Sequence, residues 1–169
     1  MNDEITRLAQ IIAPLRALLD KADYMDVKTF TSQRALPDFI ARMIGYQPGW
    51  LKALYTARKA LARLLGLSQV PPSQQHLTAE DVNFTPGGAV GFFTTLDGDP
   101  GQYWIGEAAD KHLCGYIGVV AEPNEDGGTR FSTFTIVHYR HWTGPVYFNL
   151  IRPFHHLVVH FMGNYAARE

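Results

Sequence analysis

The sequence predicts an α+β fold in which an antiparallel sheet is covered by helices on one face. Two observations support this prediction: the order of the elements along the chain, and the short links between four apolar and aromatic runs after about residue 90. Only turn residues separate these runs, so no link is long enough for the crossover that parallel strands require. Consecutive strands joined in this way form a meander of antiparallel hairpins.

The first half of the chain is expected to hold helices and one strand. Apolar residues at helical spacing open the chain: Ile5, Leu8, Ile12, Leu15 and Leu19. Because Pro14 removes a backbone donor midway, we expect a bent or two-piece helix there. Residues 24–33 are rich in Val, Thr and aromatic side chains and favour a strand. A short helix over about 37–44 should follow, and then a longer helix that begins at Pro48 and ends at Gly66.

The second half of the chain is expected to hold the sheet and a closing helix. The four runs are Val90–Leu96, Gln102–Glu107, Lys111–Ala121 and Thr129–Arg140. The closing helix should run from Pro145 to about Tyr165, and Pro153 should bend it because proline cannot complete the helical hydrogen-bond ladder. The residues expected on or beside its sheet-facing side are Phe154, His155, Val158 and Phe161.

Composition and charge exclude several classes of protein. The chain has 169 residues, of which 46% are hydrophobic, so it can bury a core without a disulfide or a metal. Its 15 Lys and Arg residues nearly balance 16 Asp and Glu residues, which argues against nucleic-acid binding. No apolar run reaches membrane-spanning length, and we expect no membrane partner. The one cysteine, Cys114, fits a reducing compartment, so we expect a cytoplasmic protein.

Four motifs stand out along the chain. They are Pro48-Gly49-Trp50 leading through Ala57-Arg58 to Leu65-Gly66-Leu67, then Val90-Gly91-Phe92-Phe93, then Gly106-Glu107-Ala108-Ala109-Asp110-Lys111-His112-Leu113, and last Gly144-Pro145-Val146-Tyr147 through Ile151-Arg152-Pro153-Phe154-His155. Over about residues 24–165 the sequence resembles a bacterial domain-of-unknown-function family numbered 2867. The resemblance implies a helix-grip fold of the START and polyketide-cyclase kind (SRPBCC). In that fold a curved antiparallel sheet wraps around a long C-terminal helix and encloses a hydrophobic cavity.

The resemblance also implies a domain division and a partner. Residues 1–22 would form an N-terminal helical extension, and residues 23–169 a single helix-grip domain. Members of the family occur alone or behind an NAD(P)-binding domain of the short-chain-dehydrogenase type, which implies a functional link to such an enzyme. This chain has no glycine-rich dinucleotide loop, so it resembles the stand-alone form and we expect no cofactor. The family usually has an acidic residue at the position of Cys114.

Seven residues are candidates for contact with a ligand in such a cavity: Arg58, Trp104, His112, Tyr116, Tyr139, Phe154 and His155. Arg58 falls inside the apolar stripe of its helix and needs a partner there. That partner would be Glu107 or Asp110 in a structural ion pair, or else a carboxylate on a ligand. His155 could act as a general base or a hydrogen-bond donor, or it could cap a carbonyl freed by Pro153.

Two further patterns are weaker candidates. His112 and Cys114 lie two apart on one strand, but no third group that would orient the histidine is visible in the sequence. Two histidine pairs could hold zinc: His156 and His160, which are four apart on a helix, and the clustered His138 and His141. Neither pair is accompanied by the glutamate of a zinc helix or by a second cysteine. We therefore expect neither a nucleophilic cysteine nor a metal site.

Three functions remain as hypotheses. The first is binding of a small apolar or amphipathic molecule in an internal cavity. The second is an enzyme of the cyclase or hydrolase kind, which would use His155 or His112 as a base and Arg58 to hold an anionic group. The third is a structural module that forms a homodimer through an aromatic face of its sheet.

Overall fold

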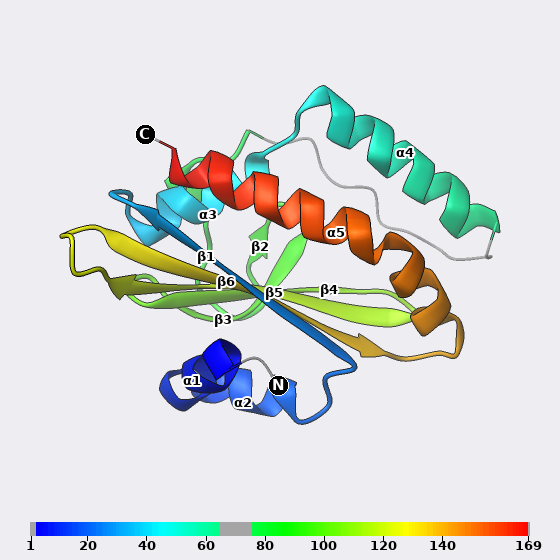
Figure 1. The fold of residues 1–169 in the computed structure, drawn as a ribbon, viewed down its shortest axis with the longest axis horizontal. Coiled ribbons are helices and arrows are strands. Elements are labelled where there is room, and N and C mark those ends of the chain that lie inside the picture. Colours follow the sequence, from blue (N-terminus) through cyan, green and yellow to red (C-terminus); the bar gives the residue numbers. More distant parts are fainter. Residues whose placement is uncertain (1–2, 65–75, 169) are drawn as a thin grey trace.

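The computed structural model describes residues 3–64 and 76–168, with the backbone alone at residues 57, 58 and 60–64. The described chain forms three layers, with a six-stranded sheet between two groups of helices (Figure 1). The strands are β1 (Tyr24–Ser32), β2 (Ala89–Val90), β3 (Phe93–Asp99), β4 (Tyr103–Ala109), β5 (Leu113–Pro123) and β6 (Thr129–Tyr139). All neighbours pair antiparallel, in the order β1-β6-β5-β4-β3-β2. The predicted antiparallel meander is confirmed, and β1 extends it beside β6.

The helices are α1 (Asp3–Ile11), α2 (Ala13–Leu19), α3 (Leu36–Gly45), α4 (Gly49–Leu64) and α5 (Thr143–Ala167), with a short 3-10 helix η1 (Ala79–Asp81). The predicted two-piece N-terminal helix is confirmed. Ile12 has an extended backbone between α1 and α2, and Pro14 lies in the first turn of α2, where a missing backbone donor costs little. The predicted helix end at Gly66 lies outside the described residues.

One expected strand is divided into two. The run Val90–Leu96 turns at Gly91, whose φ of 61° lies in the left-handed region that glycine adopts readily. Strand β2 therefore ends at Val90 and β3 begins at Phe93, and the two strands pair as a tight hairpin. The sequence prediction missed this turn because it treated the whole apolar run as one strand.

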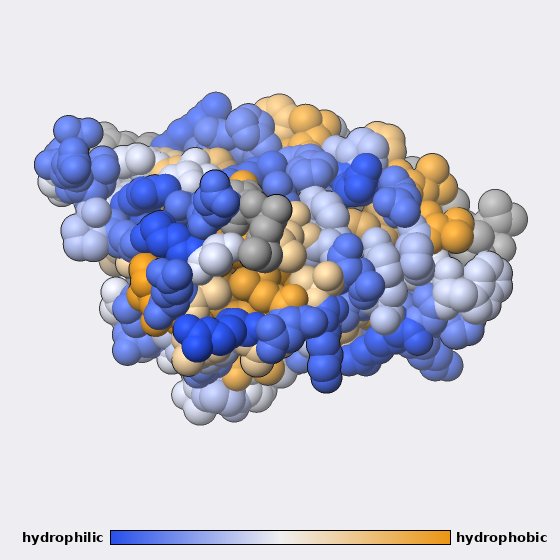
Figure 2. All heavy atoms as spheres, turned by 60° about the horizontal axis from the view of Figure 1, so that its bottom comes forward, coloured by the Kyte–Doolittle hydropathy of each residue, from blue (hydrophilic) through white to orange (hydrophobic). Residues whose placement is uncertain are grey.

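The N-terminal helices cover the face of the sheet that the sequence prediction left bare. Buried apolar residues of α1 and α2 pack against sheet residues that point to this side: Ile105, Val120, Phe134 and Ile136. A sheet with apolar side chains on both faces must be covered on both, so the expectation of helices on one face only is wrong. Figure 2 looks onto this side and shows a mainly hydrophilic surface, with hydrophobic residues gathered in its middle and near its upper margin.

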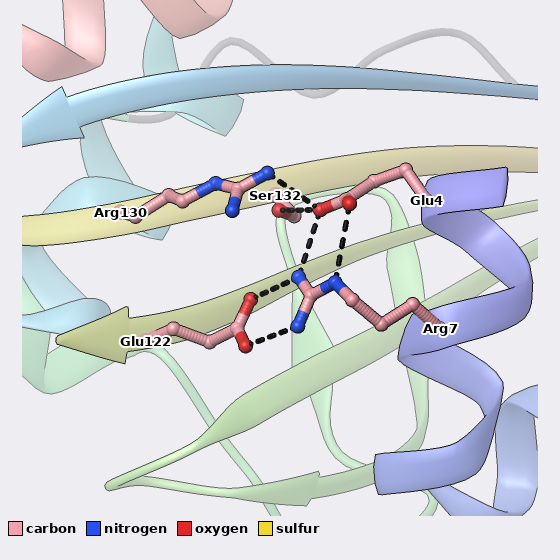
Figure 3. Close-up of polar contacts among 5 residues, drawn as sticks. All are labelled: Glu4, Arg7, Glu122, Arg130 and Ser132. Carbon is pink, nitrogen blue, oxygen red and sulfur yellow. Dashed lines mark hydrogen bonds and ion pairs between the residues drawn. The ribbon is translucent and has the colours of Figure 1, made fainter. Parts of the chain in front are cut away.

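A network of charged side chains ties α1 to the sheet (Figure 3). The Arg7 guanidinium donates two hydrogen bonds to the Glu122 carboxylate on β5, at 2.7 and 2.6 Å. The Glu4 carboxylate accepts hydrogen bonds from Arg7 and Arg130, both at 2.8 Å, and from the Ser132 hydroxyl at 3.2 Å. The hydrogen bonds from Arg7 are the main cause that lowers the pKa of both Glu4 and Glu122.

The opposite face of the sheet is covered by α3 and α5. Phe39 of α3 stacks on Phe131 of β6, with ring centroids 4.1 Å apart. Gly163 of α5 lies directly on the ring of Phe30 in β1, since a Cβ built on this glycine would come within 2.1 Å of that ring. The long C-terminal helix therefore crosses the sheet in close contact at its C-terminal end.

The rotation of α5 differs from the prediction. Phe154 and Phe161, which were expected against the sheet, are 50% and 42% exposed. The residues buried under the helix are Gly144, Tyr147, Phe148, Val159, Met162, Gly163 and Ala166. Because α5 is apolar on most of its circumference, hydrophobic periodicity does not fix its rotation, whereas the two glycines permit close approach on one side only.

The course of α5 agrees with the predicted bend. The helix is continuous through Pro153, and Figure 1 shows its first turns angled away from the line of the remaining helix. Within the described chain, no helix combines the length and the apolar character needed to cross a membrane.

Candidate functional site

A cavity of about 310 Å³ lies between α4, α5 and the sheet. Strand alternation explains its floor, because Leu113, Gly115 and Ile117 of β5 point to one face while the residues between them point to the other. Helix α5 supplies most of one wall, and α4 supplies Leu54 and Tyr55 on the other side. Gly115 leaves the floor open, since a Cβ built there would meet only the Ala108 carbonyl oxygen, at 3.7 Å.

The polar groups of the cavity are few. His155 Nε2 lies 3.3 Å from the Thr135 hydroxyl, and the tautomer of the ring decides which of the two donates. Gln47 and Tyr55 also belong to the lining. Among the lining residues that the structure describes, none is Asp, Glu, Lys or Arg. The site is therefore suited to an uncharged, mainly apolar molecule with one or two polar groups.

The mouth of the cavity is formed by residues that both line it and face solvent. Leu150 and Phe154 of α5 are about half exposed, at 54% and 50%, and Phe92 between β2 and β3 is 37% exposed. Buried lining residues such as Val159 mark the closed end. The cavity therefore opens beside the outer side of α5.

Three of the seven predicted ligand-contact residues belong to the cavity lining: Tyr116, Phe154 and His155. Tyr116 contributes its backbone, since its ring packs on the opposite face, with its centroid 5.1 Å from that of His138. Phe154 lies at the mouth. His155 is half-buried on the sheet side of α5 and points toward Thr135 of β6.

Three other predicted residues do not line the cavity. Trp104 is fully buried in the core, where its indole N–H donates to the Thr95 hydroxyl at 2.9 Å. A ring nitrogen of His112 lies 2.8 Å from the Thr143 hydroxyl at the start of α5, which indicates a role in holding the helix terminus. Tyr139 packs beside Phe148, with ring centroids 6.2 Å apart. The structure thus gives none of these three side chains a place in the lining.

Comparison with known proteins shows which family the chain belongs to. The family model described as "Protein of unknown function (DUF2867)" matches residues 18–162. The chain belongs to this family. The cavity lining runs from Ile44 to Met162, so all of it falls inside the region that defines the DUF2867 family. The antiparallel sheet with a long C-terminal helix across one face has the helix-grip architecture that the resemblance implied.

Solved structures with low sequence identity align over most of the chain. Ara h 8.0201 is 10% identical with a TM-score of 0.40, and the alignment covers 85% of this chain and 97% of that one. The Mll3558 protein from Rhizobium loti is 13% identical with a TM-score of 0.44, and the alignment covers 84% and 96%. No curated protein matches the chain.

The side chain of Arg58, the seventh predicted residue, lies outside the described residues. Its two expected partners have other contacts in the DUF2867 chain. Glu107 accepts a hydrogen bond from the Cys114 thiol at 3.3 Å and lies 4.0 Å from the Arg140 guanidinium. The Asp110 carboxylate accepts hydrogen bonds from the backbone N–H groups of His112 and Leu113. These bonds stabilise the turn between β4 and β5.

The weaker candidates do not assemble into a reactive group. Burial is the main cause that raises the pKa of the Cys114 thiol to about 11, so the thiolate needed for nucleophilic attack is scarce at neutral pH. His138 contacts the Leu18 carbonyl oxygen and His156 contacts the Tyr24 hydroxyl, which gives both structural roles. In the described part of the chain, no group of three metal-ligating side chains converges.

Several lining residues were not singled out from the sequence. Gly115 could have been found, because it alternates with Leu113 and Ile117 on a predicted strand. Gln47 and Tyr55 carry no such signal, since their place in the lining depends on how the connection between α3 and α4 and then α4 itself lie over the sheet.

Proposed function

We propose that this DUF2867 domain binds a small apolar or amphipathic molecule in the cavity between α4, α5 and the sheet. The observation that supports this proposal is the cavity itself: about 310 Å³, lined mainly by apolar side chains, with a mouth on the outer side of α5. That volume is at the lower end of the range of small-molecule sites. Burial of apolar ligand surface would supply most of the binding free energy.

One polar pair gives the site a means of orienting its ligand. The His155 ring and the Thr135 hydroxyl contact each other in the cavity wall. A ligand hydroxyl or carbonyl placed beside them could form a hydrogen bond with either group. The apolar surroundings would strengthen such a bond. We therefore favour an uncharged ligand with one polar end, over one that carries a carboxylate.

The two alternative functions receive less support. An acid–base enzyme of the expected kind would hold an anionic group with a cation beside His155, and the described lining contains tyrosines but no Lys, Arg, Asp or Glu. A homodimer through an aromatic sheet face would need that face to be open, whereas helices of the same chain cover both faces in the described residues. Ligand binding is the function that the geometry supports best.

A cavity-filling variant tests this proposal. Gly115→Leu adds a side chain to the cavity floor without a close contact at Cβ, and Ala109→Leu adds the same side chain at an exposed position of β4. The probe is 1-aminoanthracene, an uncharged aromatic fluorophore. We expect it to bind the wild-type domain and to bind Gly115→Leu at least about tenfold more weakly, a loss of roughly 1.4 kcal/mol, with Ala109→Leu unchanged. Equal affinity for the wild type and both variants would overturn the proposal.

A further inference from the structure

The outer side of α5 carries a row of partly exposed hydrophobic residues, of which Phe161 also packs against Trp50 of α4 and Tyr165 against Tyr46. The row, called here the outer stripe, consists of Trp142, Val146, Leu150, Phe154, Leu157, Phe161 and Tyr165, each between 40% and 75% exposed. Successive members are three or four residues apart, so they lie on one face of the helix. Folded domains seldom expose so many large apolar side chains together, and such a patch usually marks a binding surface.

The charge around the outer stripe is of one sign. Neither α4 nor α5 contains an Asp or Glu residue. Exposed basic residues lie on both helices and at the ends of α5: Lys52, Lys59, Arg140, Arg152 and Arg168. The net charge of the chain is only −1, but its basic and acidic residues are unevenly distributed, since α4 and α5 carry basic residues alone.

Three acidic groups near this side are already paired with basic groups. Asp26, which faces α5 from β1, lies 3.0 Å from the Lys28 ammonium and 3.2 Å from His156. Glu107 lies 4.0 Å from the Arg140 guanidinium. The carboxylate of Asp38 is paired with Arg34 at 2.6 Å. The ion pairs of the described residues engage Arg140 but not Lys52, Lys59 or Arg152, so these three cations keep an attraction for an external anionic surface.

From the sequence we expected no membrane partner, because no apolar segment is long enough to span a bilayer; on the basis of this surface we instead propose that the outer stripe docks on the surface of an anionic phospholipid bilayer. Large apolar and aromatic side chains on one helix face, flanked by Lys and Arg, form the pattern by which helices lie in the interfacial region of membranes. Tryptophan, here Trp142 at the start of α5, favours that region. Lys52, Lys59 and Arg152 would lie near the lipid phosphates and acidic headgroups.

A second copy of the chain fits the outer stripe less well. Symmetric pairing would place this acid-free face against itself, so basic residues would meet basic residues with no acidic partner on the face to neutralise them. A lipid surface supplies the missing negative charge. Leu150 and Phe154 belong both to the outer stripe and to the cavity mouth, so a docked domain would turn that mouth toward the bilayer.

Co-sedimentation with lipid vesicles tests the docking. One set of vesicles contains phosphatidylcholine alone, and the other also contains phosphatidylglycerol at about a third of the lipid. We expect the full chain to sediment with the anionic vesicles and to bind neutral vesicles at least about fivefold more weakly. Raising the salt from about 0.1 M to about 0.5 M should weaken the anionic binding, because salt screens exposed charges.

Matched variants locate the contact. Val146→Glu with Leu157→Glu changes two stripe residues that do not line the cavity, and Arg152→Glu reverses a flanking charge. Ile11→Glu on α1 and Arg16→Glu on α2 are the controls, since both positions are exposed on the opposite side of the sheet. We expect the stripe variants to lose binding by about tenfold and the controls to bind as the wild type does. All variants should still bind 1-aminoanthracene, which separates this proposal from that of the cavity.

Four results would overturn the docking proposal. The first is that the wild type fails to sediment with anionic vesicles, and the second is that it binds neutral vesicles equally well. The third is that the stripe and control variants lose binding equally. The fourth is that the wild type forms a dimer but binds no vesicles, and that the double variant Val146→Glu with Leu157→Glu dissociates this dimer. The last result, read by sedimentation velocity, would make the outer stripe an interface between two copies.

Discussion

Arg7 holds the first helix to the sheet through carboxylates from two distant parts of the chain. Glu4 lies one turn away from Arg7, whereas Glu122 is 115 residues further along, so only the first contact has a sequence signal. The side chains are 22–38% exposed, so each pair is partly screened by water, but the bidentate geometry and the shared carboxylate of Glu4 favour a net contribution.

Removal of Arg7 should destabilise the domain in a pH-dependent way. Arg7→Met is expected to lower the free energy of unfolding by about 1 kcal/mol at pH 7. The pKa values of Glu4 and Glu122 are lowered in the folded state, so their contribution is present above the unfolded carboxyl pKa of about 4.3 and is lost as the pH falls through the folded values.

Urea unfolding at pH 7 and at about pH 3 measures this effect. The difference between the wild type and Arg7→Met should shrink at the lower pH. Arg16→Met, at an exposed position of α2, is the control and should match the wild type at both pH values. A difference between wild type and Arg7→Met that is the same at both pH values would show that the network does not act through the charged carboxylates.

Residue identity predicted the cavity lining only in part. His155 and Phe154 were found because helical periodicity placed them near the expected cavity. Trp104 was selected as an aromatic residue of the meander, but its ring lies over Gly106, where a Cβ would come within 2.4 Å of the indole, and this contact holds it in the core. Chemical type alone does not say whether an aromatic residue on the cavity side of the sheet lines the cavity or packs in the core beside it.

At the scale of elements, the strands followed the sequence closely and α5 did not. Residues 24–33 and the three later runs gave β1, β4, β5 and β6 to within a few residues, since a half-buried strand has a clear pattern. The prediction for α5 was wrong because of the exposed outer stripe. An apolar helix face that is exposed has the same hydrophobic periodicity as one that is buried. Gly144 and Gly163, rather than the large apolar residues, mark the side of α5 that meets the sheet.

Gly163→Ala should therefore disturb the docking of α5. The new Cβ would lie 2.1 Å from the Phe30 ring, so the helix or the ring must move. We expect a loss of about 1–3 kcal/mol in the free energy of unfolding, despite the higher helix propensity of alanine. Gly49→Ala at the start of α4 is the matched control, because nothing lies within 4 Å of its Cβ. If thermal unfolding shows Gly163→Ala to be as stable as Gly49→Ala, the close contact between α5 and β1 does not hold.

At the scale of the whole molecule, the cavity forms between the sheet and one of the two helical layers that cover it. The N-terminal helices seal one face of the sheet, which leaves the other face for α3, α4 and α5. Motif order was sufficient to predict the DUF2867 family and its helix-grip fold. It was not sufficient to predict the second helical layer, because hydrophobic alternation on a strand does not say what covers each face. The net charge of the chain likewise did not indicate that α4 and α5 form a side without acidic residues.

The central claim is that a small apolar molecule occupies the cavity between α4, α5 and the sheet. Methyl NMR spectra recorded during titration with 1-aminoanthracene test it most directly. The methyl signals of Leu113, Val137 and Val158, which line the cavity, should shift on binding. Those of Leu8 and Val120, in the core beneath the N-terminal helices, should stay in place. Shifts confined to the second group, or no shift at saturating probe, would contradict the claim.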